Sequence, residues 1–256
     1  MFPFPSNAFL TEDSSTVTGY RVNYTKTSVP GSGTFKQVEI PGLNRLDGMS
    51  PSTQILTAFD EDPVLTGVAN QSAIEKSLIA DHATILVNLD TGERLPHWVE
   101  LDSRTDNKGP TILYIRTIRG LDHNTAYGVG ISGLTNSTGD LISPSLAFKA
   151  LIEGDYTDAP DVELRAASFD NLFVSLESHG YSRGDLQAAW EFHTASTESM
   201  IQDLVEMRDD ASERLGSEGI GCNVTEVIDD WGEENTTFRL IRGTVTTPQY
   251  MESSPK

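Results

Sequence analysis

The stretch TILYIRTIRGLDHNTAYGVGISGLTNSTGDLISPSLAFKAL, residues 111–151, decides the expected fold. Two runs of alternating apolar and polar residues flank LDHNTAY at residues 121–127, and the second run ends in a turn cluster at Asn136 to Gly139. A period of two residues is typical of strands with one buried face. The stretch therefore predicts the edge of a β-sandwich rather than an active site.

The chain before this stretch shows further strand patterns. Residues 1–50 are rich in Pro, Gly, Ser and Thr, which predicts an extended segment with short strands, one of them at residues 19–24. Residues 73–78 have helical spacing. Because Asp and Gly favour tight turns, Asp90 to Gly92 predicts a hairpin between its two flanking strands. The strands expected in this part lie at residues 54–59, 85–89 and 95–101.

A change of composition near residue 154, at GDYTDAPD, predicts a domain edge. An apolar stripe from Leu164 to Leu176 predicts a helix that stops at Gly180. A second helix is expected at residues 197–215, capped by Ser196 and followed by Gly216. Strands are expected at residues 186–194, 223–231 and 236–250. The sequence thus predicts three parts, residues 1–50, 51–153 and a mixed α/β region at 154–256.

Charge and composition exclude several classes of protein. The 256 residues include 38 acidic and 18 basic side chains, for a net charge of −20, which opposes nucleic-acid binding because phosphate contacts need clustered Lys and Arg. The single cysteine, Cys222, cannot form an intramolecular disulfide. The first residues, MFPFPSNAF, lack the features of a signal peptide, and no run of apolar residues is long enough to predict a transmembrane segment.

No motif predicts a catalytic, cofactor or metal site. Ser132 lies in GISG at residues 130–133, but a turn cluster follows it where a nucleophile elbow needs a helix. Phosphate-binding loops and the zinc-helix motif are absent from the sequence. The histidines lie in different expected elements, with no pair at the spacing of two ligands on one helix. They are His82, His97, His123, His179 and His193.

Three weaker patterns were weighed against ordinary structural roles. Asp60 to Asp62, and Asp102 and Asp106 with Asn107, could supply oxygen ligands for calcium, but their spacing does not match a calcium-binding loop. Tryptophans could stack on sugars, yet each occupies an alternating strand position that favours core packing. The tryptophans are Trp98, Trp190 and Trp231. The glycosylation sequons begin at Asn23, Asn70, Asn136, Asn223 and Asn235, and we expect them to be coincidental.

The motifs around residues 54–150 resemble the bacterial Ig-like domain of S-layer and secreted proteins. Leu121, Asn124, Thr125 and Tyr127 fit that family's turn, and Gly133 with Gly139 fits its final loop. The wider chain resembles the N-terminal region of secreted bacterial lipase- or esterase-like α/β-hydrolases of the virulence-factor lipase type. The matching segments are Phe4 to Phe9, Gly19 to Asn23 with Tyr20 inserted, Leu46 to Ser50, Trp190 to Ser196, Met207 to Asp209, and Gly243 to Pro248.

The resemblance implies a mainly β fold with an α/β C-terminal part, in which an Ig-like β-sandwich carries an N-terminal wrapping segment. It also implies an extracellular or cell-surface location. In that family the nucleophile, acid and histidine follow the region matched here, so no catalytic residue can be carried over. We therefore expect a non-catalytic accessory portion whose partner is an α/β-hydrolase catalytic domain and whose wider targets are a cell surface or a lipid or ester substrate. No cofactor is expected.

Two alternatives remain open at this stage. The chain could be a free-standing extracellular adhesion or glycan-binding module that uses an exposed aromatic or calcium-lined patch. It could also be an enzyme with an unfamiliar site. A contiguous apolar surface on the helix at residues 197–215 or on the last strand would favour a missing domain, whereas a groove bearing tryptophan would favour glycan binding.

Overall fold

A computed structural model describes residues 3–28, 40–103, 110–157, 160–217, 219, 221–232, 234 and 236–250. It contains two compact units, Met1–Met200 and Ile201–Lys256. The units therefore do not separate near residue 154, where the sequence predicts a domain edge. The larger unit continues past that point because strand β8, Leu186–His193, pairs with strand β7, Ala126–Ser132.

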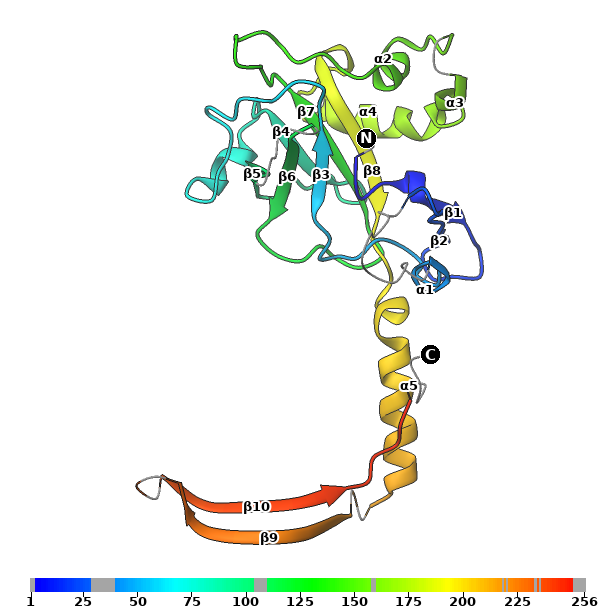
Figure 1. The fold of residues 1–256 in the computed structure, drawn as a ribbon. Coiled ribbons are helices and arrows are strands. Elements are labelled where there is room, and N and C mark those ends of the chain that lie inside the picture. Colours follow the sequence, from blue (N-terminus) through cyan, green and yellow to red (C-terminus); the bar gives the residue numbers. More distant parts are fainter. Residues whose placement is uncertain are drawn as a thin grey trace. The chain divides into compact units, whose positions relative to one another are not determined.

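The larger unit is built on two three-stranded antiparallel sheets, whose strands are labelled in Figure 1. The first has the order β3-β6-β5, with bounds Ile55–Ala58, Ile112–Thr117 and His97–Leu101. The second has the order β4-β7-β8, and β4 spans Thr84–Asn88. This architecture confirms the mainly β fold and the alternating strands expected on either side of residues 121–127.

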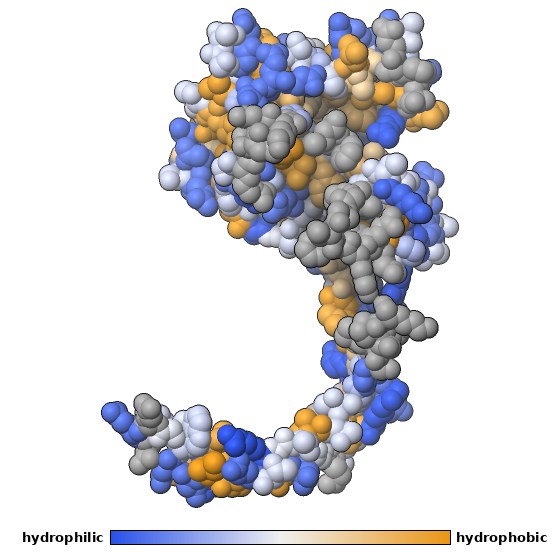
Figure 2. Space-filling view, in the orientation of Figure 1, coloured by the Kyte–Doolittle hydropathy of each residue, from blue (hydrophilic) through white to orange (hydrophobic). Residues whose placement is uncertain are grey.

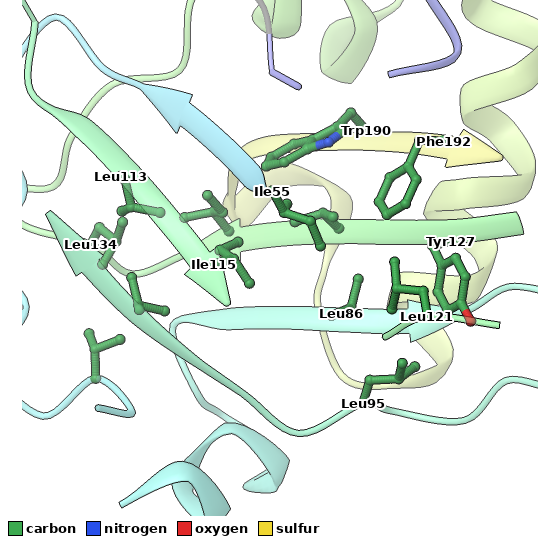
Figure 3. Close-up of a cluster of buried hydrophobic side chains, with 14 of the residues drawn as sticks. Ile55, Leu86, Leu95, Leu113, Ile115, Leu121, Tyr127, Leu134, Trp190 and Phe192 are labelled. Carbon is green, nitrogen blue, oxygen red and sulfur yellow. The ribbon is translucent and has the colours of Figure 1, made fainter. Parts of the chain in front are cut away.

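The two sheets face each other across one hydrophobic core. Ile55 and Ile115 enter it from the first sheet, while Leu86, Tyr127 and Phe192 enter it from the second. Figure 3 shows these side chains between the strands. Each of the five is at most 1% exposed. The period of two in the sequence therefore corresponds to side chains that alternate between this core and the opposite face of each sheet.

Helices cover the other face of the β4-β7-β8 sheet. α4, Ala166–Ser178, approaches strand β7 closely because Gly128 and Gly130 leave room for it. A Cβ atom on Gly128 would lie 2.7 Å from Leu172 Cδ1, and one on Gly130 would lie 2.9 Å from Ile85 Cγ2. Ile85 and Leu172 belong to a second core that α4 forms with this sheet and with α2. Gly128 and Gly130, which lie on the same face of β7, thus allow α4 to pack close to the sheet.

The sequence predictions for this helical layer are partly wrong. Leu164, expected to begin the helical stripe, lies before α4 and is 90% exposed. α2, Leu146–Glu153, was not predicted, although Ser145 caps it and Gly154 ends it with a φ of 70°. The remaining short helical elements are α1 at Ile40–Leu43, η2 at Ile74–Leu78, α3 at Pro160–Glu163 and η3 at Arg183–Asp185.

The predicted hairpin between residues 85–89 and 95–101 is wrong beyond its turn. Gly92 has the expected positive φ, 74°, and the Leu95 N–H donates to the Leu86 carbonyl at 2.8 Å. After this short pairing the chain crosses to the other sheet, so β4 and β5 belong to different sheets. A tight turn determines the pairing only of the residues beside it. The rest of β4 and β5 lie in different sheets, which pack against each other across the inter-sheet core.

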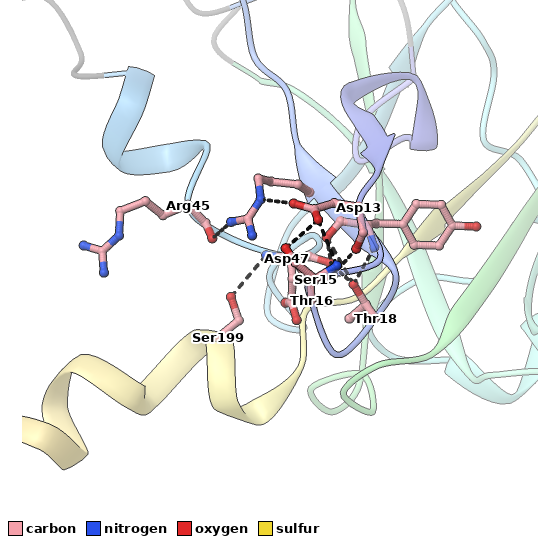
Figure 4. A network of polar contacts seen from close by, with 9 residues as sticks. Asp13, Ser15, Thr16, Thr18, Arg45, Asp47 and Ser199 are labelled. Carbon is pink, nitrogen blue, oxygen red and sulfur yellow. Dashed lines mark hydrogen bonds and ion pairs between the residues drawn. The ribbon is translucent and has the colours of Figure 1, made fainter.

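The described part of the N-terminal segment belongs to the larger unit and contains short strands. It contains η1, Asn7–Phe9, and the paired strands β1, Leu10–Glu12, and β2, Tyr20–Val22. Figure 4 shows a polar network between the N-terminal segment and the start of α5. The Asp47 N–H donates to Ser199 Oγ at 3.1 Å, and the Thr18 hydroxyl donates to the Asp47 carbonyl. The Ser196 N–H also donates to Asp47 Oδ1 at 3.0 Å, so one buried carboxylate joins this segment to the start of α5.

The smaller unit consists of most of helix α5 and one β-hairpin. α5 spans Thr197–Leu215, the range predicted from the sequence, and Ser196 Oγ accepts from the Ser199 N–H at 3.0 Å as its expected cap. The hairpin pairs β9, Cys222–Trp231, with β10, Thr237–Val245, in antiparallel register. Both predicted strands are therefore present in the structure.

Candidate interaction surface

The β9-β10 hairpin carries apolar side chains on both of its faces. Ile241 lies opposite Val227, and Trp231 lies on the same face because residues alternate along each strand. Leu240 lies opposite Ile228 on the other face, which also holds Phe238. Strands that are buried on both faces show this pattern, whereas a hairpin with one solvated face has polar residues on that face.

Leu240 and Ile228 are half-buried, but the other apolar side chains of the hairpin are exposed in the described part of the chain. Phe238 is 78% exposed, and Ile241 and Trp231 are 59% and 44% exposed. Figure 2 shows orange, apolar surface on the hairpin between blue, hydrophilic residues. We define the hairpin surface as these side chains with the exposed apolar neighbours on the same strands, which are Val224, Val227 and Val245.

Ion pairs across the strands hold the hairpin register. Arg239 Nε lies 2.5 Å from Asp229 Oδ1, and Arg242 Nη1 lies 2.7 Å from Glu226 Oε2. All four side chains are well exposed, so each pair stabilises the hairpin by less than about 1 kcal/mol. The ion pairs can define which residues face each other, but they cannot replace a hydrophobic core. A two-stranded hairpin without such a core is marginally stable in water.

Helix α5 also lacks a covered face. Its apolar residues follow the predicted spacing, yet none of its described residues is buried. Within the smaller unit, Leu204 is 66% exposed and Ile201 is 43% exposed. A packed amphipathic helix would bury such a stripe. The helix therefore has the sequence of a packed element, but Ile201 and Leu204 of its stripe are exposed, and Val205 and Met207 are only half-buried.

The Ser132 hydroxyl makes a hydrogen bond to the backbone. Ser132 ends strand β7, and its hydroxyl donates to the Asp185 backbone carbonyl at 3.0 Å. An activated serine needs a base within hydrogen-bond reach of its hydroxyl. The Asp185 carbonyl is not such a base, because it cannot take the hydroxyl proton.

Two of the histidines meet in the interior, which the sequence did not predict. The rings of His82 and His97 lie 5.9 Å apart. His97 Nδ1 lies 2.9 Å from the Leu95 carbonyl, so this nitrogen must carry the proton, and its Nε2 then accepts from the Thr84 hydroxyl at 2.8 Å. His82 Nε2 accepts from the Ala69 N–H at 2.8 Å. Both rings are therefore held in the neutral form.

Burial lowers the pKa of both histidine rings. Desolvation lowers the pKa of His97 to about 4 and also lowers the pKa of His82. A second proton would bury a charge on either ring, and on His82 it would also break the hydrogen bond from the Ala69 N–H. The pair joins the strands of the two sheets, so its role is structural.

The other candidates from the sequence do not form a site. Asp60, Glu61 and Asp62 are exposed, and Glu61 accepts from the Asn136 side chain at 2.6 Å. Among the described residues, no group of three or more His, Cys, Asp or Glu side chains is placed to hold a metal ion. Asp106, Asn107 and Asn235 lie outside the described residues.

The tryptophans lie in different elements, and Trp190 also lines a cavity beside β8. Trp190 is 1% exposed in the inter-sheet core, Trp98 is half-buried on β5, and Trp231 lies on the hairpin. Across the ranges that the structure describes, no helix is long and apolar enough to cross a membrane. No protein-family model matches the chain, and the search of curated proteins gives no match.

Proposed function

We propose that this chain is the non-catalytic accessory portion of a secreted lipase- or esterase-like hydrolase, and that its hairpin surface docks on the α/β catalytic domain. The observation that carries the proposal is a hairpin with apolar side chains on both faces, most of which are exposed in the described part of the chain. Large exposed apolar surfaces mark interaction sites. The sequence resemblance supplies the identity of the partner.

A sheet is the partner that fits this surface best. Both faces of the hairpin are apolar around Ile241 and Phe238, so the partner has to supply a covering layer on each side. The sheet of an α/β domain has such layers because helices cover both of its faces. The strands β9 and β10 also have outer edges whose N–H and C=O groups can pair with a further strand. The hairpin would thus extend the partner's sheet.

The larger unit would then be an Ig-like module that positions the enzyme. Tyr127 supports this finer assignment, because its hydroxyl accepts a hydrogen bond from the Asp122 N–H at 2.9 Å, five residues upstream. A tyrosine that bonds back to the chain in this way is a feature of Ig-like sandwiches. In this proposal the module works outside the cell or on its surface and holds the catalytic domain near its lipid or ester substrate.

No specific observation favours the alternatives. Glycan binding would require exposed aromatic side chains in a shared groove, but Trp190 is buried and Trp231 belongs to the hairpin surface. Catalysis by the chain itself would require a base beside a nucleophile, and the Ser132 hydroxyl donates to a carbonyl.

A binding experiment with matched variants tests the proposal. The full chain is titrated with the separately expressed catalytic domain of a lipase of the resembled type, in calorimetry. We expect one-to-one binding that Phe238→Asp weakens at least about 100-fold, because a buried aromatic residue at an interface is worth ~2 kcal/mol or more and the substitution also buries a charge. Leu164→Asp is the control, since Leu164 is 90% exposed and lies outside the hairpin.

An activity measurement completes the test. The chain by itself should not hydrolyse p-nitrophenyl butyrate, whereas the complex should. Turnover by the isolated chain that Ser132→Ala abolishes would overturn the non-catalytic assignment. Absence of binding, or equal binding by the Phe238→Asp variant, would overturn the docking surface.

A further inference from the structure

A cavity of about 300 Å³ lies between the N-terminal segment, helices α2 and α4, and strand β8. Figure 1 shows these helices beside β8. Its apolar wall includes Phe148, Leu151 and Phe169. Asn7 and Glu191 contribute polar groups to the lining. The volume is at the lower end of the range for small-molecule sites, which begins at about 300 Å³.

The apolar wall is held in place by its own packing. Phe148 is 7% exposed, and its ring centroid lies 6.4 Å from that of Phe169 and 6.3 Å from that of Phe173. Phe169 and Phe173 are also in contact, at 5.9 Å. Three mutually packed rings on two helices resist collapse into the cavity. The space is therefore a formed feature of the fold.

The polar lining of the cavity includes two acceptors, the Glu191 carboxyl and Asn7 Oδ1, beside one buried donor without a partner among the described residues, Trp190 Nε1. The Glu191 carboxyl interacts with the side chains of Asn7 and Ser168, and desolvation raises its pKa. Asn7 Oδ1 is buried and has no hydrogen-bond partner among the described residues. A buried acceptor without a partner destabilises the folded chain. A ligand that brings a hydrogen-bond donor to Asn7 and Glu191 would remove this destabilisation.

We propose that this cavity binds a small apolar molecule that carries one primary ammonium group. The aromatic wall fits the apolar body, and the ammonium group has three donors for Glu191 and Asn7. The net charge of −20 favours a cationic ligand over an anionic one. Arg165 also lines the cavity, but it is exposed, so water screens its charge.

Calorimetric titrations of the full chain with three matched probes test this site. The probes are phenylbutylamine, phenylbutanol and phenylbutyrate, which share the apolar body and differ in the head group. We expect one saturable site that prefers the amine to the alcohol by at least about tenfold, with no measurable binding of the carboxylate. Tenfold corresponds to ~1.4 kcal/mol, a modest value for a charge-assisted hydrogen bond.

Variants identify the site. Ala147→Trp should abolish binding of all probes, because Ala147 lines the cavity. Leu146→Trp is the matched control, since this neighbouring residue on α2 is 76% exposed and is not part of the lining. Glu191→Gln should reduce amine affinity to that of the alcohol and leave alcohol binding unchanged. Asn7→Ala provides a second head-group variant if Glu191→Gln fails to fold.

The proposal is overturned if the amine and the carboxylate bind equally, or if none of the probes binds. It is also overturned if amine binding survives Ala147→Trp, which would indicate attraction to the acidic surface in general. Amine binding that neither Glu191→Gln nor Asn7→Ala weakens would remove the assigned head-group site.

Discussion

Acid should destabilise the larger unit through His97. This side chain is 0% exposed, and its pKa is about 4, against about 6.5 for an exposed histidine. Desolvation is the main cause, and the positive charges of Arg94 and of a protonated His82 act in the same direction. Since the unfolded chain takes up the proton more readily than the folded chain, the free energy of unfolding falls as the pH drops below about 6.5.

The expected loss can be worked out for a pH range that stays above the isoelectric point of about 4.4. Between pH 7 and pH 5 the unfolded histidine becomes almost fully protonated, while the folded one remains mostly neutral. This difference removes about 2 kcal/mol of stability. Urea unfolding gives the loss of unfolding free energy between pH 7 and pH 5 for the wild-type chain and for His97→Gln. The contribution of His97 is the difference between these two losses.

The comparison also has a control and a contrary outcome. His179 lies at the C-terminal end of α4, outside the buried pair, so His179→Gln should lose as much stability as the wild type. Equal losses for the wild type and His97→Gln would refute the claim that folding lowers the pKa of His97. If His97→Gln does not fold, an NMR titration of the wild-type ring replaces it, and a His97 ring that protonates near pH 6.5 would be the refuting result.

Further substitutions test the packing. Leu172→Ala, at a fully buried position in α4, should lower the free energy of unfolding by about 2–5 kcal/mol in urea titrations. Gly48→Ala places a Cβ 2.6 Å from a backbone nitrogen and should lower the melting temperature, whereas Gly184→Ala meets nothing within 4 Å and should leave it nearly unchanged. Tyr127→Phe leaves the Asp122 N–H without its acceptor and should cost about 1–3 kcal/mol; an unchanged unfolding midpoint would show that this bond is dispensable.

Local periodicity predicted most of the regular elements. The alternation around LDHNTAY corresponds to β6 and β7, and the range of α5 agrees at both ends, because Ser196 and Gly216 mark those ends in the sequence. The sequence does not predict α2, because this helix is short and follows Pro144 and Ser145 in a segment that looks like a loop. Leu164 was misplaced because an apolar residue beside a helix fits the helical period as well as one inside it.

Non-local features could not be predicted from the sequence. β4 and β5 are connected through a tight turn yet lie in different sheets, because the packing of the inter-sheet core determines which strands pair. The contact between His82 and His97 depends on this arrangement of the two sheets, so no spacing in the sequence predicts it. The strands of the hairpin were predicted correctly, but exposure on both faces is a property of the folded chain.

Hydrogen exchange of the hairpin amides tests the central claim most directly. In the isolated chain, amides of β9 and β10 should exchange at nearly the rate of an unfolded peptide, while those of β7 at the centre of its sheet remain protected. Adding the catalytic domain of a lipase of the resembled type should protect the hairpin amides at least about 100-fold, which corresponds to ~2.7 kcal/mol. Strong protection of the hairpin in the isolated monomer, or no added protection in the mixture, would contradict the account.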